Sequence, residues 1–366
     1  MAGLIIYDLQ KEIMNTKNFD RIVQDFPPLT KFPRAELFSD RTILERLPYL
    51  SRKLDINLFI KRDDTLPLCL GGNKVRQLEF YLGEAVKNGS DTILITGSIQ
   101  SNFVRLCAAA SRKLGMQPVV QLEKRVPNNS HMYNSSGNVL LLKMLGAKII
   151  SFAEGEDEVR ADANLDIIAN KLRVEGAKPY TIHLGTNHPP IGALGYIAAA
   201  VETLQQARGM NLLFDHVVLP SGSALTHAGF LAGMRYLKQN INIHGICVRR
   251  ASSLQKKRAL LRTNEIGRMV GKPNIVGIED IYVDDTCLEP GYGRVNKNVV
   301  EALSLSAIQE GIILDPVYSG KAFAGLIHLT RNGTIARGKN VLFIHTGGTP
   351  ANFGYQSEIE SMTIDF

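Results

Sequence analysis

The sequence has few of the features that mark secreted, disulfide-bonded or membrane-spanning proteins. It has no Trp in 366 residues, and its four cysteines, Cys69, Cys107, Cys247 and Cys287, lie far apart without a C-x-x-C pair. That spacing supports neither a zinc site nor a disulfide framework, so we expect no metal and reduced thiols. No run approaches the roughly 18 apolar residues of a membrane span, and Met1–Glu12 does not read as a signal peptide. We therefore expect a cytoplasmic protein without a membrane partner.

Blocks of like charge and several catalytic motifs are also absent. The 42 basic and 35 acidic residues are interspersed, and the net charge of +7 suits small anions better than nucleic acid. There is no G-x-S-x-G, H-E-x-x-H or G-x-G-x-x-G, so serine hydrolases, zinc peptidases and dinucleotide-binding enzymes are not indicated. The segment 333–340 approaches a P-loop, but it has Asn340 where Ser or Thr would bind magnesium and it precedes a strand.

What the sequence does contain is a regular alternation of short β-branched runs and longer helical segments. This alternation predicts an α/β protein with parallel sheets covered on both faces, and the length suits two lobes. The expected strands are 92–96, 118–122, 148–152, 180–183, 216–219, 243–248 and 341–345. The expected helices include 75–87, 102–114, 136–145, 159–174, 193–207 and 228–238. Left-handed helix ends are expected at Gly89, Gly115, Gly146, Gly176 and Gly209.

The segment Gly71-Gly72-Asn73-Lys74 opens an amphipathic helix and offers a candidate nucleophile. Glycines permit backbone conformations closed to other residues, and the positive field of a helix N-terminus lowers the pKa of a lysine there. Lys74 could thus be a Schiff-base lysine, although the tetrapeptide alone is more typical of a solvated lysine at a helix start.

Three polar turns follow predicted strands, where ligands bind in open α/β sheets. Gly97–Asn102 could line a site, or Ser101 or Asn102 could simply cap a helix. Ser221–His227 could cradle a phosphate through helix amides and hydroxyls, with His227 itself more typical of a structural histidine. Thr346–Pro350 could admit a flat ligand or be a tight exit turn.

The combination of these features is more specific than any one of them. An amine, an anion cradle and polar groups at two further strand ends are what pyridoxal 5'-phosphate (PLP) needs as covalent anchor, phosphate anchor and contacts to ring and substrate.

From about Thr30 to Tyr355 the chain resembles the D-cysteine desulfhydrase and 1-aminocyclopropane-1-carboxylate (ACC) deaminase family of fold type II PLP enzymes, which are like the tryptophan synthase β subunit. The resemblance is carried by ordered motifs: Lys61–Asp64, Gly71–Lys74, Gln100–Asn102, Gly192–Tyr196, Thr226–Gly229, Pro290–Gly293, Leu314–Lys321 and His345–Pro350.

The resemblance implies the roles of individual residues. Lys74 would form the imine with the cofactor, Asn102 would contact the ring hydroxyl, and Thr346 would lie at the pyridine nitrogen. The phosphate loop would be Ser223, Ala224, Leu225 and Thr226. Substrate-side residues would be Gln100, Ser101, Phe103, Tyr292 and Tyr318, of which Ser101 and the two tyrosines would act in catalysis together with Lys74.

The resemblance also implies a fold and an assembly. We expect two open, twisted, mostly parallel sheets flanked by helices, with the cofactor between the lobes. Residues 1–75 and 185–366 would form the large PLP-binding domain, with an N-terminal extension, and residues 76–184 the small domain. Relatives of this kind are usually homodimers, and the expected partner is otherwise a small amino-acid substrate.

Two residues separate the activities within the family. ACC deaminases are expected to have Glu and Leu where this chain has Ser319 and Thr346, so the resemblance favours D-cysteine desulfhydrase. The implied reaction is β-elimination from a small amino acid, giving pyruvate, ammonia and, from D-cysteine, sulfide.

Two departures from the family leave other readings open. Phe103 replaces a polar residue, and Leu225 replaces a glycine in the phosphate loop, where a branched side chain resists positive φ. ACC deaminase, a divergent lyase or racemase, and a catalytically degenerate PLP-binding protein therefore remain alternatives.

Overall fold

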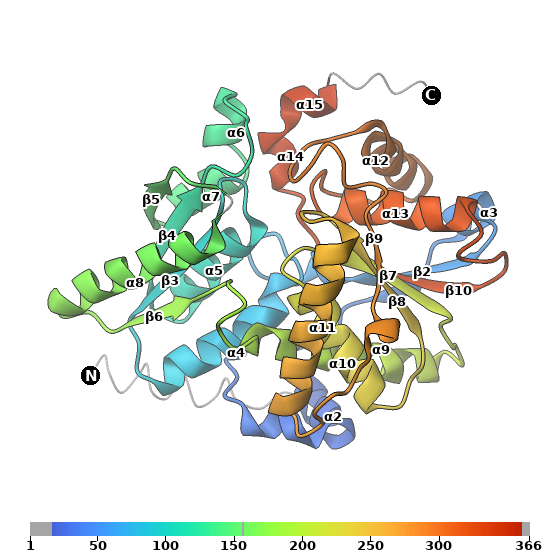
Figure 1. Cartoon of the computed structure of the whole chain (residues 1–366), viewed down its shortest axis with the longest axis horizontal. Coiled ribbons are helices and arrows are strands. Elements are labelled where there is room, and N and C mark those ends of the chain that lie inside the picture. Colours follow the sequence, from blue (N-terminus) through green and yellow to red (C-terminus); the bar gives the residue numbers. More distant parts are fainter. Residues whose placement is uncertain (1–16, 156, 361–366) are drawn as a thin grey trace.

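The computed structural model describes residues 17–155 and 157–360 and contains two separate β-sheets. Figure 1 shows them in two lobes, with α4 running between the lobes. The strands are β1 (Leu44–Arg46), β2 (Asn57–Arg62), β3 (Thr92–Ser98), β4 (Gln117–Glu123), β5 (Lys148–Phe152), β6 (Pro179–Ile182), β7 (His216–Ser221), β8 (Asn242–Cys247), β9 (Tyr282–Asp284) and β10 (Asn340–His345). The expectation about Met1–Glu12 falls outside the described residues.

The larger sheet has six strands in the order β1-β2-β10-β7-β8-β9. All neighbours are parallel except β1 and β2, which are antiparallel. Successive residues of β7 face opposite sides: Val218 packs in one apolar cluster with α13, and Val217 and Leu219 pack in another with α9 and α10. Both faces are therefore covered, which explains why these strands read as continuous apolar runs.

The smaller sheet has four parallel strands in the order β5-β4-β3-β6. Ile93 and Ile95 of β3 pack in a cluster with residues of α4 and α5, whereas Leu94 packs on the other face against Leu165 of α8. This sheet is thus also sandwiched between helices, as expected for strand–helix alternation.

Six of the helices, α4, α5, α7, α8, α9 and α10, agree with the expected ranges to within a few residues, and the structure contains further helices for which no range was expected. They are α2 (Lys17–Asp25), α3 (Pro48–Leu54), α4 (Lys74–Lys87), α5 (Asn102–Lys113), α6 (His131–Ser135), α7 (Asn138–Met144), α8 (Glu158–Val174), α9 (Leu194–Gly209), α10 (Leu225–Tyr236), α11 (Ser252–Met269), α12 (Lys297–Glu310), α13 (Ser319–Arg331), α14 (Ala351–Gly354) and α15 (Gln356–Glu360). Among the described residues no helix is long and apolar enough to cross a membrane.

One expected helix end is wrong. Gly89, Gly115, Gly146 and Gly176 do have positive φ, but Gly209 is the last residue of α9. The left-handed conformation falls two residues later, on Asn211 with φ 50°. Asparagine tolerates this region better than most residues, so the left-handed stop falls on Asn211, directly after the C-cap Met210.

The domain boundaries after residues 75 and 184 remain a prediction. The distribution of strands supports them, because β3–β6 all lie within 76–184 and every strand of the larger sheet lies outside that range.

Candidate active site

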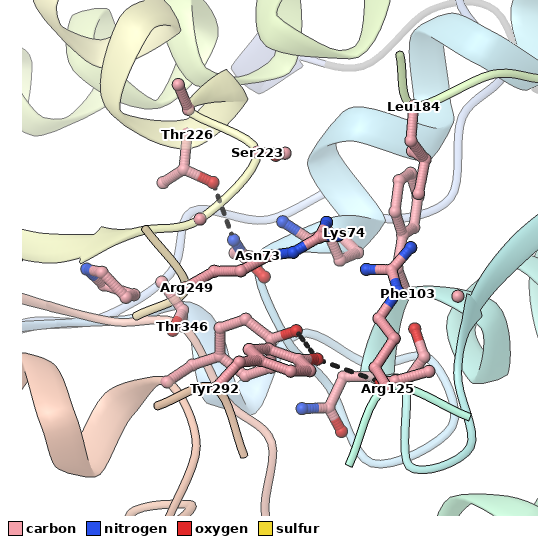
Figure 2. Close-up of a pocket in the computed structure, with 18 of the residues that line it drawn as sticks. Asn73, Lys74, Phe103, Arg125, Leu184, Ser223, Thr226, Arg249, Tyr292 and Thr346 are labelled. Atoms are coloured by element: carbon pink, nitrogen blue, oxygen red, sulfur yellow. Dashed lines mark hydrogen bonds between the residues drawn. The ribbon is translucent and has the colours of Figure 1, made fainter. Parts of the chain in front are cut away.

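A pocket of about 890 Å³, open mouth included, lies between the two sheets. Its walls come from the carboxyl ends of strands in both sheets and from the first turns of α4, α5, α8 and α10. The lining residues include Asn73, Lys74, Ser98, Ser101, Asn102, Phe103, Arg125, Glu158, Leu184, Ser223, Ala224, Thr226, Arg249, Tyr292, Tyr318 and Thr346 (Figure 2). The structure therefore brings together residues from all of the predicted polar turns.

The loop before Lys74 has an unusual backbone. Cys69, Leu70, Gly71 and Gly72 have successive φ values of 43°, 63°, 64° and 127°. A Cβ on Gly71 would lie 1.8 Å from the carbonyl oxygen of Asp64, so this position requires glycine. A residue other than glycine, such as Cys69 or Leu70, pays a free-energy cost to adopt a left-handed backbone conformation. Such strained residues are concentrated at functional sites, where the surrounding structure holds them in place. The loop thereby delivers Lys74 at the first position of α4.

Lys74 lies in the pocket as an amine that gives up its proton easily. Burial lowers the pKa of Lys74 from its ordinary value of 10.5 to about 8. The Nζ atom lies 5.5 Å from the ring centroid of Phe103, and no described residue accepts a hydrogen bond from it. Burial disfavours the charged form of the amine, and the position of Lys74 at the start of α4 is where the expected helix field would act in the same direction. A pKa near 8 leaves an appreciable neutral fraction at physiological pH, as a nucleophilic amine needs.

The start of α5 places Ser101 and Asn102 on the pocket wall. The Ser101 Oγ accepts a hydrogen bond from the Val104 N–H at 3.2 Å, so Ser101 is both the helix cap and a lining residue. The Asn102 side chain is oriented by the Nδ2 group of Asn138, which donates to its Oδ1 at 2.9 Å. The amides of this helix end lack intrahelical acceptors and favour an anion such as a carboxylate.

Gln100 is not among the lining residues. Its Nε2 donates to the carbonyl oxygens of Tyr133 at 2.6 Å and Ser136 at 3.0 Å, and its Oε1 accepts from the Asn138 N–H at 3.0 Å. This side chain is therefore committed to holding α6 and α7 beside the turn. Its predicted contact with substrate has no geometric support.

The loop before α10 is shaped for an anion. Ala224 has φ 71°, and α10 begins at Leu225, so the positive φ falls on Ala224 instead of on Leu225. The Leu225 side chain is buried in an apolar cluster with Phe80 and Ile197. The loop accommodates leucine because that residue already has helical φ, and it can contact an anion only through its backbone.

Thr226 is oriented by two neighbouring amides. Asn73 Nδ2 and Gln77 Nε2 both donate to the Thr226 Oγ1, at 2.9 Å and 3.0 Å. With its oxygen accepting twice, the hydroxyl hydrogen of Thr226 is free to donate into the pocket. The first-turn amides of α10 that lack intrahelical acceptors can add to this donor, as in phosphate sites at helix N-termini.

Two tyrosines and a serine form a chain of hydroxyl groups across the pocket. Tyr292 Oη lies 2.6 Å from Tyr318 Oη and 3.0 Å from Ser98 Oγ (Figure 2). Burial raises the pKa of Tyr318 well above its ordinary value, so this phenol stays protonated. The chain joins the end of β3 in the smaller sheet to the segment before α13.

Thr346 lines the pocket directly after β10, and its hydroxyl group lacks a hydrogen-bond partner among the described residues. Its Oγ1 is fully buried and has no hydrogen-bond partner among the described residues. Buried hydroxyls normally have a partner, so this one points to a ligand atom. Ser319, by contrast, donates to Asp315 Oδ1 at 2.6 Å and lies 3.3 Å from the Gly347 carbonyl oxygen, which holds the turn after Thr346 in place.

Three charged lining residues were missed from the sequence: Arg125, Glu158 and Arg249. Arg125 and Arg249 lie just beyond the ends of β4 and β8, so the same strand-end rule that found the other turns could have found them. Glu158 opens α8 and carried no comparable signal.

The donor set fits PLP. The Lys74 amine, with its lowered pKa, would bond to the aldehyde carbon of the cofactor. The loop Ser223–Thr226 would bind its phosphate, and the unpartnered hydroxyl of Thr346 would bind its ring nitrogen. Among the described residues no cluster of His, Cys, Asp or Glu is arranged to hold a metal ion.

Comparison with known sequences supports this assignment. The model of the family "Pyridoxal-phosphate dependent enzyme" matches residues 36–347. The chain is 40% identical over 331 residues to the D-cysteine desulfhydrase of Salmonella schwarzengrund, covering 90% of this chain and 98% of that protein. The D-cysteine desulfhydrase of Salmonella typhi is 39% identical over the same length.

Solved structures give the same result for the fold. The crystal structure of an ACC deaminase homologue matches with a TM-score of 0.82 and 34% identity, covering 92% of this chain and 98% of that one. An O-ureido-L-serine synthase matches with a TM-score of 0.61 at 16% identity, which reflects the shared fold.

Proposed function

The chain belongs to the family of pyridoxal-phosphate dependent enzymes, and from that premise we propose that it catalyses β-elimination from a small amino acid, with D-cysteine as the leading substrate. The products would be pyruvate, ammonia and sulfide. The observation that carries the proposal is the Lys74 amine, with its pKa lowered to about 8, facing a phosphate cradle and a chain of hydroxyl groups in one pocket.

The residues that would hold the cofactor are Lys74, Asn102, the Ser223–Thr226 loop and Thr346. When bound, PLP supplies an electron sink that makes the α-proton of an amino acid acidic. A neutral hydroxyl such as that of Thr346 leaves the ring a weaker sink than a carboxylate would. Elimination of a good leaving group tolerates this, which favours it over opening of a cyclopropane ring.

The residues around Lys74 would place and move protons. Lys74 Nζ is suited to take the α-proton, because a group with a pKa near the working pH gains and loses a proton at little cost. Ser101 can donate to the substrate carboxylate while its oxygen caps α5. Phe103 and Leu184 give the pocket an apolar wall that excludes water.

The assay for this proposal measures keto acids released by the holoenzyme from D-cysteine, L-cysteine and ACC. We expect pyruvate from D-cysteine and no 2-oxobutyrate from ACC. Lys74→Ala should abolish the activity and the visible cofactor band, whereas Lys87→Ala, at the exposed far end of the same helix, should retain both. Absence of keto acid from every amino acid tried would overturn the proposal.

The protonation of Lys74 can be measured without turnover. In the apoprotein, acylation of Lys74 by a neutral reagent should rise with pH to a plateau, with an apparent pKa of about 8, because only the neutral amine reacts. Peptide mapping against pH gives the value, with exposed Lys87 as the internal reference. An apparent pKa of Lys74 equal to that of Lys87 would contradict the role of burial.

A further inference from the structure

Arg125 is a rigidly held cation with one edge open to the pocket. Its Nε and Nη2 donate to the two carboxylate oxygens of Glu123, each at 2.7 Å. Its Nη1 has no hydrogen-bond partner among the described residues, and the side chain as a whole is only 8% exposed. Arg125 therefore presents a fixed pair of N–H donors, which is the arrangement that binds anions well.

The carboxylate behind Arg125 is itself immobilised. Glu123 is fully buried, and Thr96 Oγ1 donates to its Oε1 at 2.6 Å. Although burial alone would lower the pKa of Arg125, the hydrogen bonds and charge of Glu123 raise it above its ordinary value. The guanidinium thus keeps its protons and can act only as a hydrogen-bond donor.

Arg125 lies at the polar end of the pocket. Tyr292 and Tyr318 line the same pocket, and Figure 2 shows Arg125 between Tyr292 and Phe103. The first turns of α5 and α10 already provide for two anions, the substrate carboxylate and the cofactor phosphate. The open edge of Arg125 is a third anion-binding element, for which the proposed function has so far given no ligand.

A β-elimination generates a third negative charge. The α-proton goes to Lys74, the electron pair of the Cα–H bond forms a Cα=Cβ double bond, and the Cβ–S bond of D-cysteine breaks with both electrons going to sulfur, so that the leaving group departs as hydrosulfide. We infer that Arg125 binds the departing β-substituent and stabilises the charge that it gains as the bond breaks. This inference rests on the β-elimination proposed above, and Glu123 is then the positioning residue for Arg125.

The inference is tested by varying the leaving group. The holoenzyme and its Arg125→Met variant are assayed with D-cysteine and with β-chloro-D-alanine, whose chloride needs far less stabilisation. Loss of one preorganised donor to a developing anion costs roughly 10²- to 10³-fold in rate, and we expect a loss of that order in kcat/KM for D-cysteine. The loss with β-chloro-D-alanine should be much smaller, and sulfide should inhibit the variant more weakly as a product.

Three further variants test whether the loss of activity in Arg125→Met could come from a structural defect instead. Arg125→Lys keeps the charge without the forked geometry and should be intermediate. The double variant Glu123→Met and Arg125→Met removes the buried pair together, so that no unpaired carboxylate remains, and it should show the same dependence on the leaving group. Arg331→Met breaks an exposed Arg–Glu pair with Glu301 and should behave as wild type.

The outcomes separate this inference from the proposed function. Equal losses for both substrates in Arg125→Met and in the double variant, with unchanged sulfide inhibition, would overturn the role of Arg125 while leaving β-elimination intact. Failure of the wild-type holoenzyme to release keto acid from either substrate would instead overturn the proposed function, and the inference with it.

Discussion

Two clusters of ion pairs differ in charge balance and burial. In the first, the cations Lys61 and Arg76 meet the anions Asp63 and Glu202, and all four side chains are at most 1% exposed. Arg76 donates to both carboxylates at 2.9 Å, which ties α4 to the loop after β2 and to α9. We call this set the balanced cluster.

At the pocket mouth the proportions are different. The carboxylate of Glu158 is shared by Arg249, Arg250 and Arg258, and these side chains are 9–18% exposed. Arg250 and Arg258 also donate to the carbonyl oxygens of Gly222 and Ser223 in the phosphate loop. We call this set the cationic cluster.

The difference separates a structural role from a binding role. A balanced, buried network has no charge left for a ligand, and removal of one member leaves the others unpaired in a low-dielectric site. Arg250 and Arg258 outnumber the single carboxylate of Glu158 that they share, and positive charge next to a phosphate loop can attract anionic ligands. We therefore expect mutations in the balanced cluster to act on stability and mutations in the cationic cluster to act on binding.

The largest effect should come from Glu202→Gln in the balanced cluster. The substitution leaves Lys61 and Arg76 short of a buried counterion, and breaking such a pair costs on the order of 3–5 kcal/mol in the free energy of unfolding. Urea denaturation monitored by circular dichroism measures it, with Glu301→Gln at the surface as the control. A loss equal to that of the control would remove the distinction between the clusters.

An intermediate effect is expected from Glu158→Gln in the cationic cluster. Although burial by itself raises the pKa of Glu158, the charges of Arg258, Arg250 and Arg249 lower it to about 2. A depressed carboxylate pKa stabilises the folded state above the ordinary value near 4.5, and this contribution is lost as pH falls towards 2.

At neutral pH the partly exposed carboxylate should account for only about 1 kcal/mol of stability. The variant should therefore be slightly less stable than wild type at pH 7, with the two converging between pH 4.5 and 2, while KM rises several-fold. Unfolding curves at a series of pH values supply the comparison. A constant difference across that range would contradict the assigned pKa.

The smallest effect should be that of salt. Because the Debye length shortens from about 10 Å at 0.1 M to about 3 Å at 1 M, added NaCl should screen the cationic cluster and leave the balanced cluster unaffected. We expect KM to rise modestly with NaCl while the denaturation midpoint of the holoenzyme barely changes. An equal response of both quantities would argue against the division of roles.

Most of the fold was accessible from the sequence because strand–helix alternation and strand-end turns are local patterns. The seven expected strands are correct to within two residues, whereas β1, β2 and β9 were not expected. Lys74, Ser101, Thr226 and Thr346 all lie in the pocket as expected. The roles proposed for them remain predictions.

What the sequence did not reveal depends on long-range packing. Gln100 lies in a motif shared with the family, yet its side chain serves α6 and α7, which come more than thirty residues later. Glu158 reaches the pocket only because α8 packs beside the loop after β8. Leu225 looked unsuitable for a phosphate loop until the structure placed the positive φ one residue earlier.

The pairing of β2 with β10 has a consequence for biosynthesis. These two strands are parallel neighbours in the middle of the larger sheet, although one lies near the beginning of the chain and the other near its end. The smaller sheet is continuous in sequence and can assemble as soon as β6 leaves the ribosome. The larger sheet cannot close until translation is almost complete, so its exposed strand edges would need protection from aggregation during synthesis.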